Sequence, residues 1–234
     1  PLAAAMEHWL DASPLSPTHL DDYLRCPLRF VWTQLCGLRD PDTVNEGDDP
    51  AAIGSLLHGV LQQAFRPYEN KMLPAGDEEK AALLRSMKDC FQEQIREKQL
   101  QQLLPPDSLA MLMAAVPLRF EAFVKALPGP SVLLGVEQKI EASLVLRSGE
   151  HRFYGIMDRL DRRDGAIHII DYKTGSIALA GSVFWEESAL FERMAELEDS
   201  DDASDGDAVL AEVRALVPSI QLLCYLAMAR AHGI

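Results

Sequence analysis

The sequence predicts an α/β (α+β) protein in which an antiparallel meander of strands is flanked by helices. Three observations lead to this fold class. Apolar residues recur at helical spacing through the N-terminal half of the chain. From Ser131 to Tyr172 the pattern changes to short runs of β-branched and aliphatic residues, which are separated by turn pairs. Helical spacing then returns near Asp207 and continues to His232.

Four helices are predicted before Ser131. The first begins at the capping sequence Ser16-Pro17 and ends before Gly37, and the second covers about residues 52–65. The third covers residues 77–104 and stops at a Pro-Pro pair, and the fourth covers residues 107–127. We expect these helices to be mainly core scaffold.

The strands are expected over residues 132–136, 142–146, 151–160 and 166–172, with turns at Ser148-Gly149 and Asp164-Gly165. In the last helical stretch, over about residues 207–232, Pro218 should introduce a kink or mark the start of a second helix. We therefore expect one compact domain, with a helical part over residues 1–130 and a core over residues 131–234.

The composition excludes several classes of protein. Of the 234 residues, 48% are apolar and 25% are charged, as in a soluble globular protein, and no apolar run reaches the roughly 18 residues of a membrane-spanning helix. The N-terminus lacks the features of a signal peptide. Four cysteines without a CxxC pair favour reduced thiols in the cytoplasm over a disulfide framework or a cysteine zinc site.

The negative charge is concentrated in one segment. A net charge of -14 would normally argue against a nucleic-acid partner. Residues 186–207, however, hold ten acidic residues and one arginine, a net charge of -9, which leaves -5 for the rest. The acidity therefore does not exclude a nucleic-acid substrate. We expect this acidic segment to be a mobile surface insertion away from any DNA path; a docking surface for a basic partner and a solvated face without a role are the alternatives.

Two aspartates are expected to face each other across the hairpin that turns at Asp164-Gly165. A two-residue turn there pairs Asp158 with Asp171, with their Cβ atoms about 5 Å apart. Two like charges at this distance destabilise a sheet unless a cation lies between them, and a divalent metal ion is suited to carboxylate oxygens. Strand alternation places Lys173 on the face of Asp171. Two strand-end aspartates that are each neutralised by a nearby Arg or Lys are the structural alternative.

Glu137 has two alternative roles. A turn at Ser148-Gly149 would pair Glu137 with Leu160 and place it on the face of Asp158. It then serves either as an outer carboxylate of the metal site or as a solvated residue at a strand end.

Several ordered blocks of the sequence resemble one known family, the PD-(D/E)XK nuclease superfamily, and within it the RecB-like branch with its AddB-type and CRISPR-associated exonucleases. The blocks extend over most of the chain, from Leu15 to Arg230. They are Leu15-Ser16-Pro17-Thr18-His19-Leu20 with Tyr23 and Cys26-Pro27, then Gly54-Ser55-Leu56-Leu57-His58, Gly155-Ile156-Met157-Asp158-Arg159, Asp171-Tyr172-Lys173-Thr174, and Gln221-Leu222-Leu223-Cys224-Tyr225.

The resemblance implies a restriction-endonuclease-like core, with a mixed central sheet, and a set of site residues. It makes Asp158 and Asp171 metal-binding carboxylates and Lys173 the catalytic lysine. It adds a metal ligand from the helical part and a main-chain carbonyl ligand, which are His58 and Tyr172. It also gives a role in positioning the lysine or the DNA backbone to two residues four apart on the last helix, Gln221 and Tyr225. A polar residue at a helix–sheet seam is the structural alternative for the histidine.

The function that the resemblance implies is that of a divalent-metal-dependent DNA nuclease, using Mg²⁺ or Mn²⁺ and acting as an exonuclease on single strands delivered by a helicase domain or subunit. An iron–sulfur cluster, with Cys26 as one ligand, would require further cysteines beyond this chain. The ends of the sequence suggest a fragment of a longer helicase-nuclease. The alternatives are a non-catalytic module of the same fold that binds DNA or docks partner subunits, and an unrelated metal-dependent phosphohydrolase.

Overall fold

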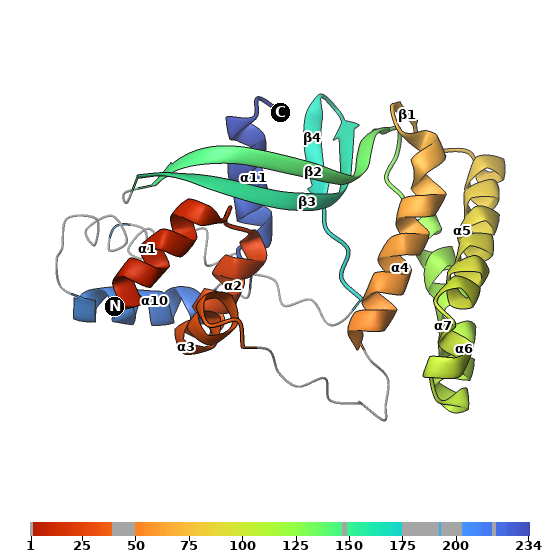
Figure 1. Cartoon of the computed structure of the whole chain (residues 1–234). Helices are drawn as coiled ribbons and strands as arrows, with labels where there is room; N and C mark the ends of the chain where they lie inside the picture. The colour runs from red at the N-terminus through yellow and green to blue at the C-terminus, as the bar shows by residue number, and fades with distance from the viewer. Residues whose placement is uncertain (1, 39–49, 147–148, 175–191, 193–202, 217–218) are drawn as a thin grey trace. The chain divides into compact units, whose positions relative to one another are not determined.

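The computed structural model describes residues 2–38, 50–146, 149–174, 192, 203–216 and 219–234 (Figure 1). Its helices are α1 (Leu2–Ala12), α2 (Pro17–Arg25), α3 (Pro27–Phe30), a π-helix η1 (Val31–Leu35), α4 (Pro50–Phe65), a 3₁₀-helix η2 (Arg66–Tyr68), α5 (Asp77–Glu97), α6 (Leu100–Leu103), α7 (Pro106–Lys125), α10 (Ala203–Leu216) and α11 (Gln221–Ala231). Its strands are β1 (Lys71–Met72), β2 (Val132–Leu146), β3 (Gly149–Arg163) and β4 (Ala166–Ile170).

The chain forms two compact units, each assembled from separate stretches of sequence. The first comprises Pro1–Pro41, Lys139–Gly155 and Ile177–Ile234, and the second comprises Asp42–Gln138 and Ile156–Ser176. Strands β2 and β3 contribute residues to both units. The division at residue 131 that the sequence suggests follows the change from helix to strand, and it stays a prediction for the domain organisation.

The sheet has the strand order β1-β2-β3-β4, and the α/β fold class is confirmed. Strands β3 and β4 are antiparallel, and their register runs from Arg159 opposite Ile170 to Arg163 opposite Ala166. This is the register expected from the hairpin. Asp164 and Gly165 both have positive φ, 52° and 79°, as a type I′ turn requires.

Strand β2 differs from the sequence prediction because it is one continuous strand over Val132–Leu146 and not two short ones. Its alternation of buried and exposed residues is interrupted where Gly135 and Val136 are both buried and Glu137 follows with φ 47°. This left-handed backbone is uncommon for a residue with a side chain. At Glu137 the irregularity changes which residues face each side of the sheet, but the strand continues beyond it. The two-residue strand β1 pairs with the start of β2 and was not predicted.

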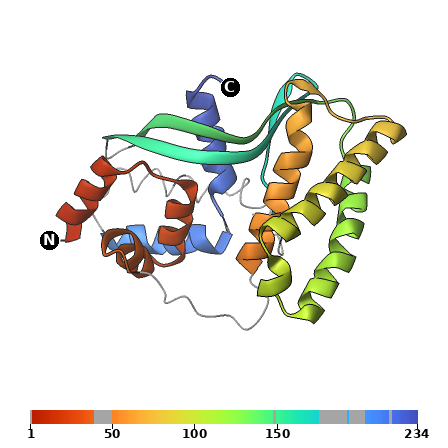
Figure 2. The same cartoon turned by 45° about the vertical axis from the view of Figure 1, so that its right-hand side comes forward.

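The core of the second unit lies among α4, α5 and α7, which run side by side in Figure 2. Helix α4 contributes Leu56, Val60 and Ala64, which are fully buried and four residues apart, and also the fully buried Phe65. Helices α5 and α7 each contribute one buried row, Leu83, Met87, Phe91 and Ile95 from the first and Leu112, Val116, Phe120 and Val124 from the second. These helices are the scaffold that their periodicity predicts.

Two of the predicted helices are shorter than expected. The first is broken at Cys26, whose extended backbone (φ -160°, ψ 101°) separates α2 from α3, because Pro27 has no N–H to continue the helix. The third ends at Glu97, and Gln99 with φ 51° separates it from the short α6. At the C-terminus, α10 and α11 are separate helices, as one of the two expectations for Pro218 requires.

Among the described residues, no helix has both the length and the apolar character to cross a membrane.

In the first unit, the last helix packs closely on strand β3 through Gly155. A Cβ atom added to Gly155 would lie 2.6 Å from Cε1 of Tyr225 and 3.4 Å from Cε of Met228. Tyr225 is buried, with 4% of its surface exposed. Asp21 of α2 fixes the start of the same helix, since it accepts hydrogen bonds from the Ser219 hydroxyl and the Ile220 N–H. Glycine at position 155 is therefore required by the contact with the tyrosine ring.

We expect Gly155→Ala to destabilise the protein by about 1–3 kcal/mol, because the added methyl group overlaps a ring that has little room to move. Thermal unfolding should show a lower midpoint. Gly129→Ala is the matched control, since nothing lies within 4 Å of a Cβ at that position. Equal unfolding midpoints for the two variants would contradict the packing of Tyr225 on Gly155.

Candidate metal centre

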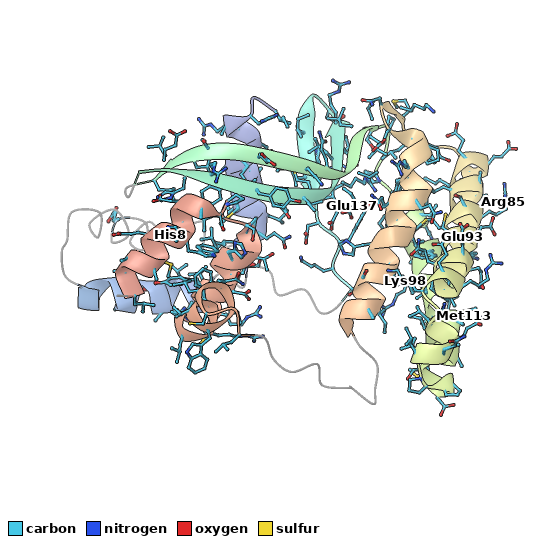
Figure 3. All side chains as sticks on the ribbon, viewed as in Figure 1. His8, Arg85, Glu93, Lys98, Met113 and Glu137 are labelled. Carbon is cyan, nitrogen blue, oxygen red and sulfur yellow. The ribbon has the colours of Figure 1, made fainter. Side chains whose placement is uncertain are left out.

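Three side chains of the second unit converge on one point. His58, Glu137 and Asp158 offer one nitrogen and two carboxylate oxygens that all lie within 4.8 Å of one another. The His58 Nδ1 atom is 3.4 Å from Oδ1 of Asp158 and 3.7 Å from Oε1 of Glu137. Figure 3 labels Glu137, the member that the sequence left undecided.

A different element positions each of the three side chains. His58 follows Leu56 and Leu57, which are buried in the core, so the packing of α4 fixes its direction. Asp158 lies in the part of β3 where every residue from Met157 to Asp161 is buried. Glu137 projects from the irregular point of β2, and its positive φ gives it a direction that regular strand geometry would not.

The two nitrogens of His58 have different environments. Nε2 lies 3.1 Å from the main-chain oxygen of Tyr172, so in the neutral ring this nitrogen carries the proton and donates it to the carbonyl. Nδ1 then presents a lone pair toward the carboxylates of Asp158 and Glu137. The hydrogen bond with Asp158 raises the pKa of His58 above its ordinary value, although partial burial opposes this shift. The Nδ1 position therefore favours a positive charge, either a proton or a metal ion.

Asp158 also binds the main chain that follows β4. Its Oδ2 accepts a hydrogen bond of 2.6 Å from the Tyr172 N–H. The ladder between β3 and β4 ends one residue earlier, at Arg159 and Ile170. Asp158 and Asp171 are therefore the next positions in the predicted register, but a side-chain hydrogen bond takes the place of a further ladder pair.

Asp171 and Lys173 form an ion pair beside this cluster. The Lys173 Nζ atom is 2.6 Å from Oδ2 of Asp171, and the lysine side chain is 45% exposed whereas that of Asp171 is 7% exposed. The sequence placed these two side chains on one face, and the structure brings them together. The carboxylate of Asp171 is not among the three groups that converge within 4.8 Å.

Burial places a cost on the negative charges of the site. It raises the pKa of Glu137, and the nearby Asp158 raises it further, although His58 opposes the shift. Burial also raises the pKa of Asp171, in spite of the opposing effect of Lys173. Carboxylates with raised pKa values next to one another are stabilised when a cation binds between them.

The donor set fits a divalent metal ion. Carboxylate oxygens suit hard cations such as Mg²⁺ and Mn²⁺, and an imidazole nitrogen is a common ligand of transition metals. The Tyr172 carbonyl orients the imidazole from its far side, as acceptors behind metal-bound histidines commonly do. The structure thus places two of the expected metal ligands, His58 and Asp158, with Glu137. The roles of Asp171 and of the Tyr172 carbonyl as metal ligands stay predictions.

A buried ion pair next to Asp158 was not recognised in the sequence. Arg159 and Asp161 are 2% and 1% exposed, and Nε and Nη2 of Arg159 donate to the two oxygens of Asp161 at 2.8 and 2.5 Å. The Arg159 guanidinium lies 4.7 Å from the centre of the Phe65 ring. Its Nη1 also lies 3.4 Å from the hydroxyl of Tyr172. The spacing of the two charges by two residues on a strand was the available signal, since it places them on one face.

Gln221 and Tyr225 lie in the first unit, on α11. The Gln221 side-chain amide donates a 3.0 Å hydrogen bond to the Tyr225 hydroxyl, as their spacing of four residues allows. The ring of Tyr225 packs against Gly155, which belongs to the same unit. Their role toward the lysine or DNA stays a prediction.

Most of the acidic segment, residues 186–207, lies outside the described residues, so its predicted mobility and its distance from a DNA path stay predictions. All four cysteines, Cys26, Cys36, Cys90 and Cys224, are free thiols. Burial is the largest cause that raises the pKa of Cys224, to about 11.

Comparison with known proteins identifies the family. Residues 14–184 match the family model of the PD-(D/E)XK nuclease superfamily. The chain is also 26% identical, over 198 residues, to a subunit of the ATP-dependent helicase/deoxyribonuclease of Carboxydothermus hydrogenoformans. That alignment covers 76% of this chain and 18% of the relative. No solved structure matches the chain. The family match takes in His58, Glu137, Asp158, Asp171 and Lys173, and the chain belongs to the PD-(D/E)XK nuclease superfamily.

Proposed function

We propose that this chain is a divalent-metal-dependent DNA nuclease domain that hydrolyses phosphodiester bonds. The observation that carries the proposal is the convergence of His58, Glu137 and Asp158 beside the pair of Asp171 and Lys173, in a member of a nuclease superfamily. Phosphodiester hydrolysis needs a polarised water and a means of balancing the charge that develops on phosphate. These five side chains supply groups for both requirements.

In this proposal, Nδ1 of His58 and the carboxylates of Asp158 and Glu137 hold a Mg²⁺ or Mn²⁺ ion. When bound, such an ion lowers the pKa of water and neutralises charge on the phosphate. The Tyr172 carbonyl keeps the imidazole in the tautomer that leaves Nδ1 free to bind, and the Tyr172 N–H keeps Asp158 in place. The protein groups are thus held in position before the substrate arrives, which is the arrangement that favours catalysis.

Lys173 is the proposed catalytic lysine. Its ammonium group is held by Asp171 at 2.6 Å but is nearly half exposed, so a phosphate group can reach it. A positive charge at this position stabilises the negative charge that develops on the phosphate oxygens, or orients the attacking water. Asp171 fixes the lysine and is also close enough to His58 and Asp158 to influence their charges, since both affect its pKa.

The name of the relative supports a proposal for the substrate and partners. The relative is a helicase/deoxyribonuclease subunit, and the chain matches a small part of that subunit's length. The name of the subunit combines a helicase and a deoxyribonuclease. We propose that the chain acts as an exonuclease on single strands delivered by a helicase domain or subunit, in the cytoplasm. The non-catalytic module that binds DNA is the alternative, and a cleavage assay distinguishes the two.

We expect the protein to degrade 5′- or 3′-labelled single-stranded DNA with Mg²⁺ or Mn²⁺, and to lose this activity when a chelator is added. Lys173→Ala should lower turnover by about 10²–10³-fold while metal binding persists, because the charge that develops in the transition state loses its partner and Lys173 is not one of the proposed metal ligands. Lys125→Ala, another exposed lysine of the same unit, is the control.

Binding of DNA without cleavage under any divalent ion would favour the non-catalytic alternative. A parallel loss of metal binding and turnover in Lys173→Ala would give the lysine a structural role. Cleavage that continues in the chelator would contradict metal dependence.

Replacing a carboxylate of the site should weaken metal binding, and replacing Glu137 should also stabilise the metal-free protein. Asp158→Asn, Asp171→Asn and Glu137→Gln should each weaken Mn²⁺ binding by about 10–100-fold, measured by calorimetry. Glu137→Gln should at the same time raise the unfolding midpoint of the metal-free protein by about 1–3 °C near neutral pH. The raised pKa of Glu137 means that its ionised form destabilises the folded state, so this gain should disappear when the pH falls below the ordinary pKa of a glutamate.

Glu121→Gln, which changes an exposed carboxylate on α7, is the control for both measurements. Unchanged Mn²⁺ binding in Asp158→Asn would contradict the metal site. A lower unfolding midpoint for Glu137→Gln would contradict the charge crowding described for the site.

A further inference from the structure

The ion pair of Arg159 and Asp161 has no evident use in stability alone. Removing two charges from water is costly, and apolar residues of similar volume often replace buried ion pairs without loss of stability. The pair is nevertheless held tightly, by two hydrogen bonds and by the ring face of Phe65 at 4.7 Å. A rigid buried cation suggests a role in holding another group.

The group that the guanidinium contacts is the Tyr172 hydroxyl, at 3.4 Å. Burial raises the pKa of Tyr172 to about 12, so the phenol is neutral at ordinary pH and its oxygen can accept a hydrogen bond. Two further rings pack edge-on against the phenol ring, those of His58 and Phe123, each with its centre 6.0 Å away. The phenol is thus anchored at its tip and at its sides.

The main chain of Tyr172 connects this anchor to the site. Its N–H donates to Asp158 and its carbonyl accepts from His58. Residue 172 lies beyond the end of β4, so the strand ladder does not hold it. Asp171 and Lys173 are its direct neighbours in sequence. A displacement of the Tyr172 ring would therefore move both of them relative to Asp158.

We propose that Arg159 and Asp161 are positioning residues, which hold the phenol of Tyr172 and thereby fix the segment that carries the proposed catalytic lysine. The proposal rests on the proposed function where it concerns metal binding and catalysis. One part of the proposal is independent of that function and applies to the metal-free protein. It states that the ion pair keeps the Tyr172 N–H hydrogen-bonded to the Asp158 carboxylate.

The test measures hydrogen exchange of the amide at position 172, in metal-free protein labelled with [¹⁵N]Tyr and [¹⁵N]Phe, together with Mn²⁺ affinity by calorimetry. The protein has five tyrosines and eight phenylalanines, so the spectrum contains few signals. In Arg159→Met/Asp161→Leu the buried charges are replaced by apolar side chains, and stability should be retained. We expect exchange at residue 172 to become at least about tenfold faster and Mn²⁺ affinity to fall at least about tenfold.

Tyr172→Phe removes only the hydroxyl and keeps the ring. It should accelerate exchange at residue 172 by about threefold or more, and it decides the question if the double variant does not fold. Tyr68→Phe is the control for the loss of a hydroxyl, and Lys88→Ala/Glu121→Ala removes an exposed ion pair of the same unit.

Folded variants with wild-type exchange at residue 172 and wild-type Mn²⁺ affinity would overturn the proposal and leave the ion pair a purely structural feature. Faster exchange in a protein whose wild type neither binds Mn²⁺ nor cleaves DNA would support the positioning role and contradict the proposed function. The two ideas can therefore fail separately.

Discussion

The site depends on one hydrogen bond, from the main-chain N–H of Tyr172 to the carboxylate of Asp158. It forms where the ladder of β3 and β4 ends, and it attaches the segment after β4 to the buried part of β3. The residues on either side of Tyr172 are the paired Asp171 and Lys173. The bond therefore holds the segment that carries Asp171 and Lys173 on Asp158, whose carboxylate faces His58.

The site combines crowded carboxylates, which destabilise the folded protein, with a tightly packed core, which stabilises it. The raised pKa values of Glu137 and Asp171 mean that their ionised forms are disfavoured in the metal-free protein. The core behind the site is apolar and aromatic, with Phe65 packed on both Arg159 and Phe123. Rigid packing of this kind can hold charged groups in an arrangement that they would not adopt by themselves. The same crowding that disfavours the ionised carboxylates favours a bound cation.

The local parts of this arrangement were predictable from the sequence. The turn pair Asp164-Gly165 specified the register of β3 and β4, because a two-residue turn allows only one pairing. It also brought Asp158 and Asp171 to neighbouring positions. The break at Cys26 could have been predicted as well, because Pro27 cannot continue a helix.

The remaining features depend on tertiary structure. The pattern of β2 implied regular alternation, and only the left-handed backbone of Glu137 directs this side chain to the site. The burial of Arg159 and Asp161 likewise depends on Phe65 of α4, which is nearly a hundred residues distant in the chain. Neither spacing nor composition specifies such contacts, because they arise when separate elements pack together.

The proposed function requires a divalent ion between His58, Glu137 and Asp158. Crystals of the protein grown with Mn²⁺, with diffraction recorded at an energy where manganese scatters anomalously, test it most directly. We predict an anomalous peak about 2–2.5 Å from Nδ1 of His58 and from an oxygen of each carboxylate. At saturating Mn²⁺, the absence of a peak between these three side chains would contradict the claim.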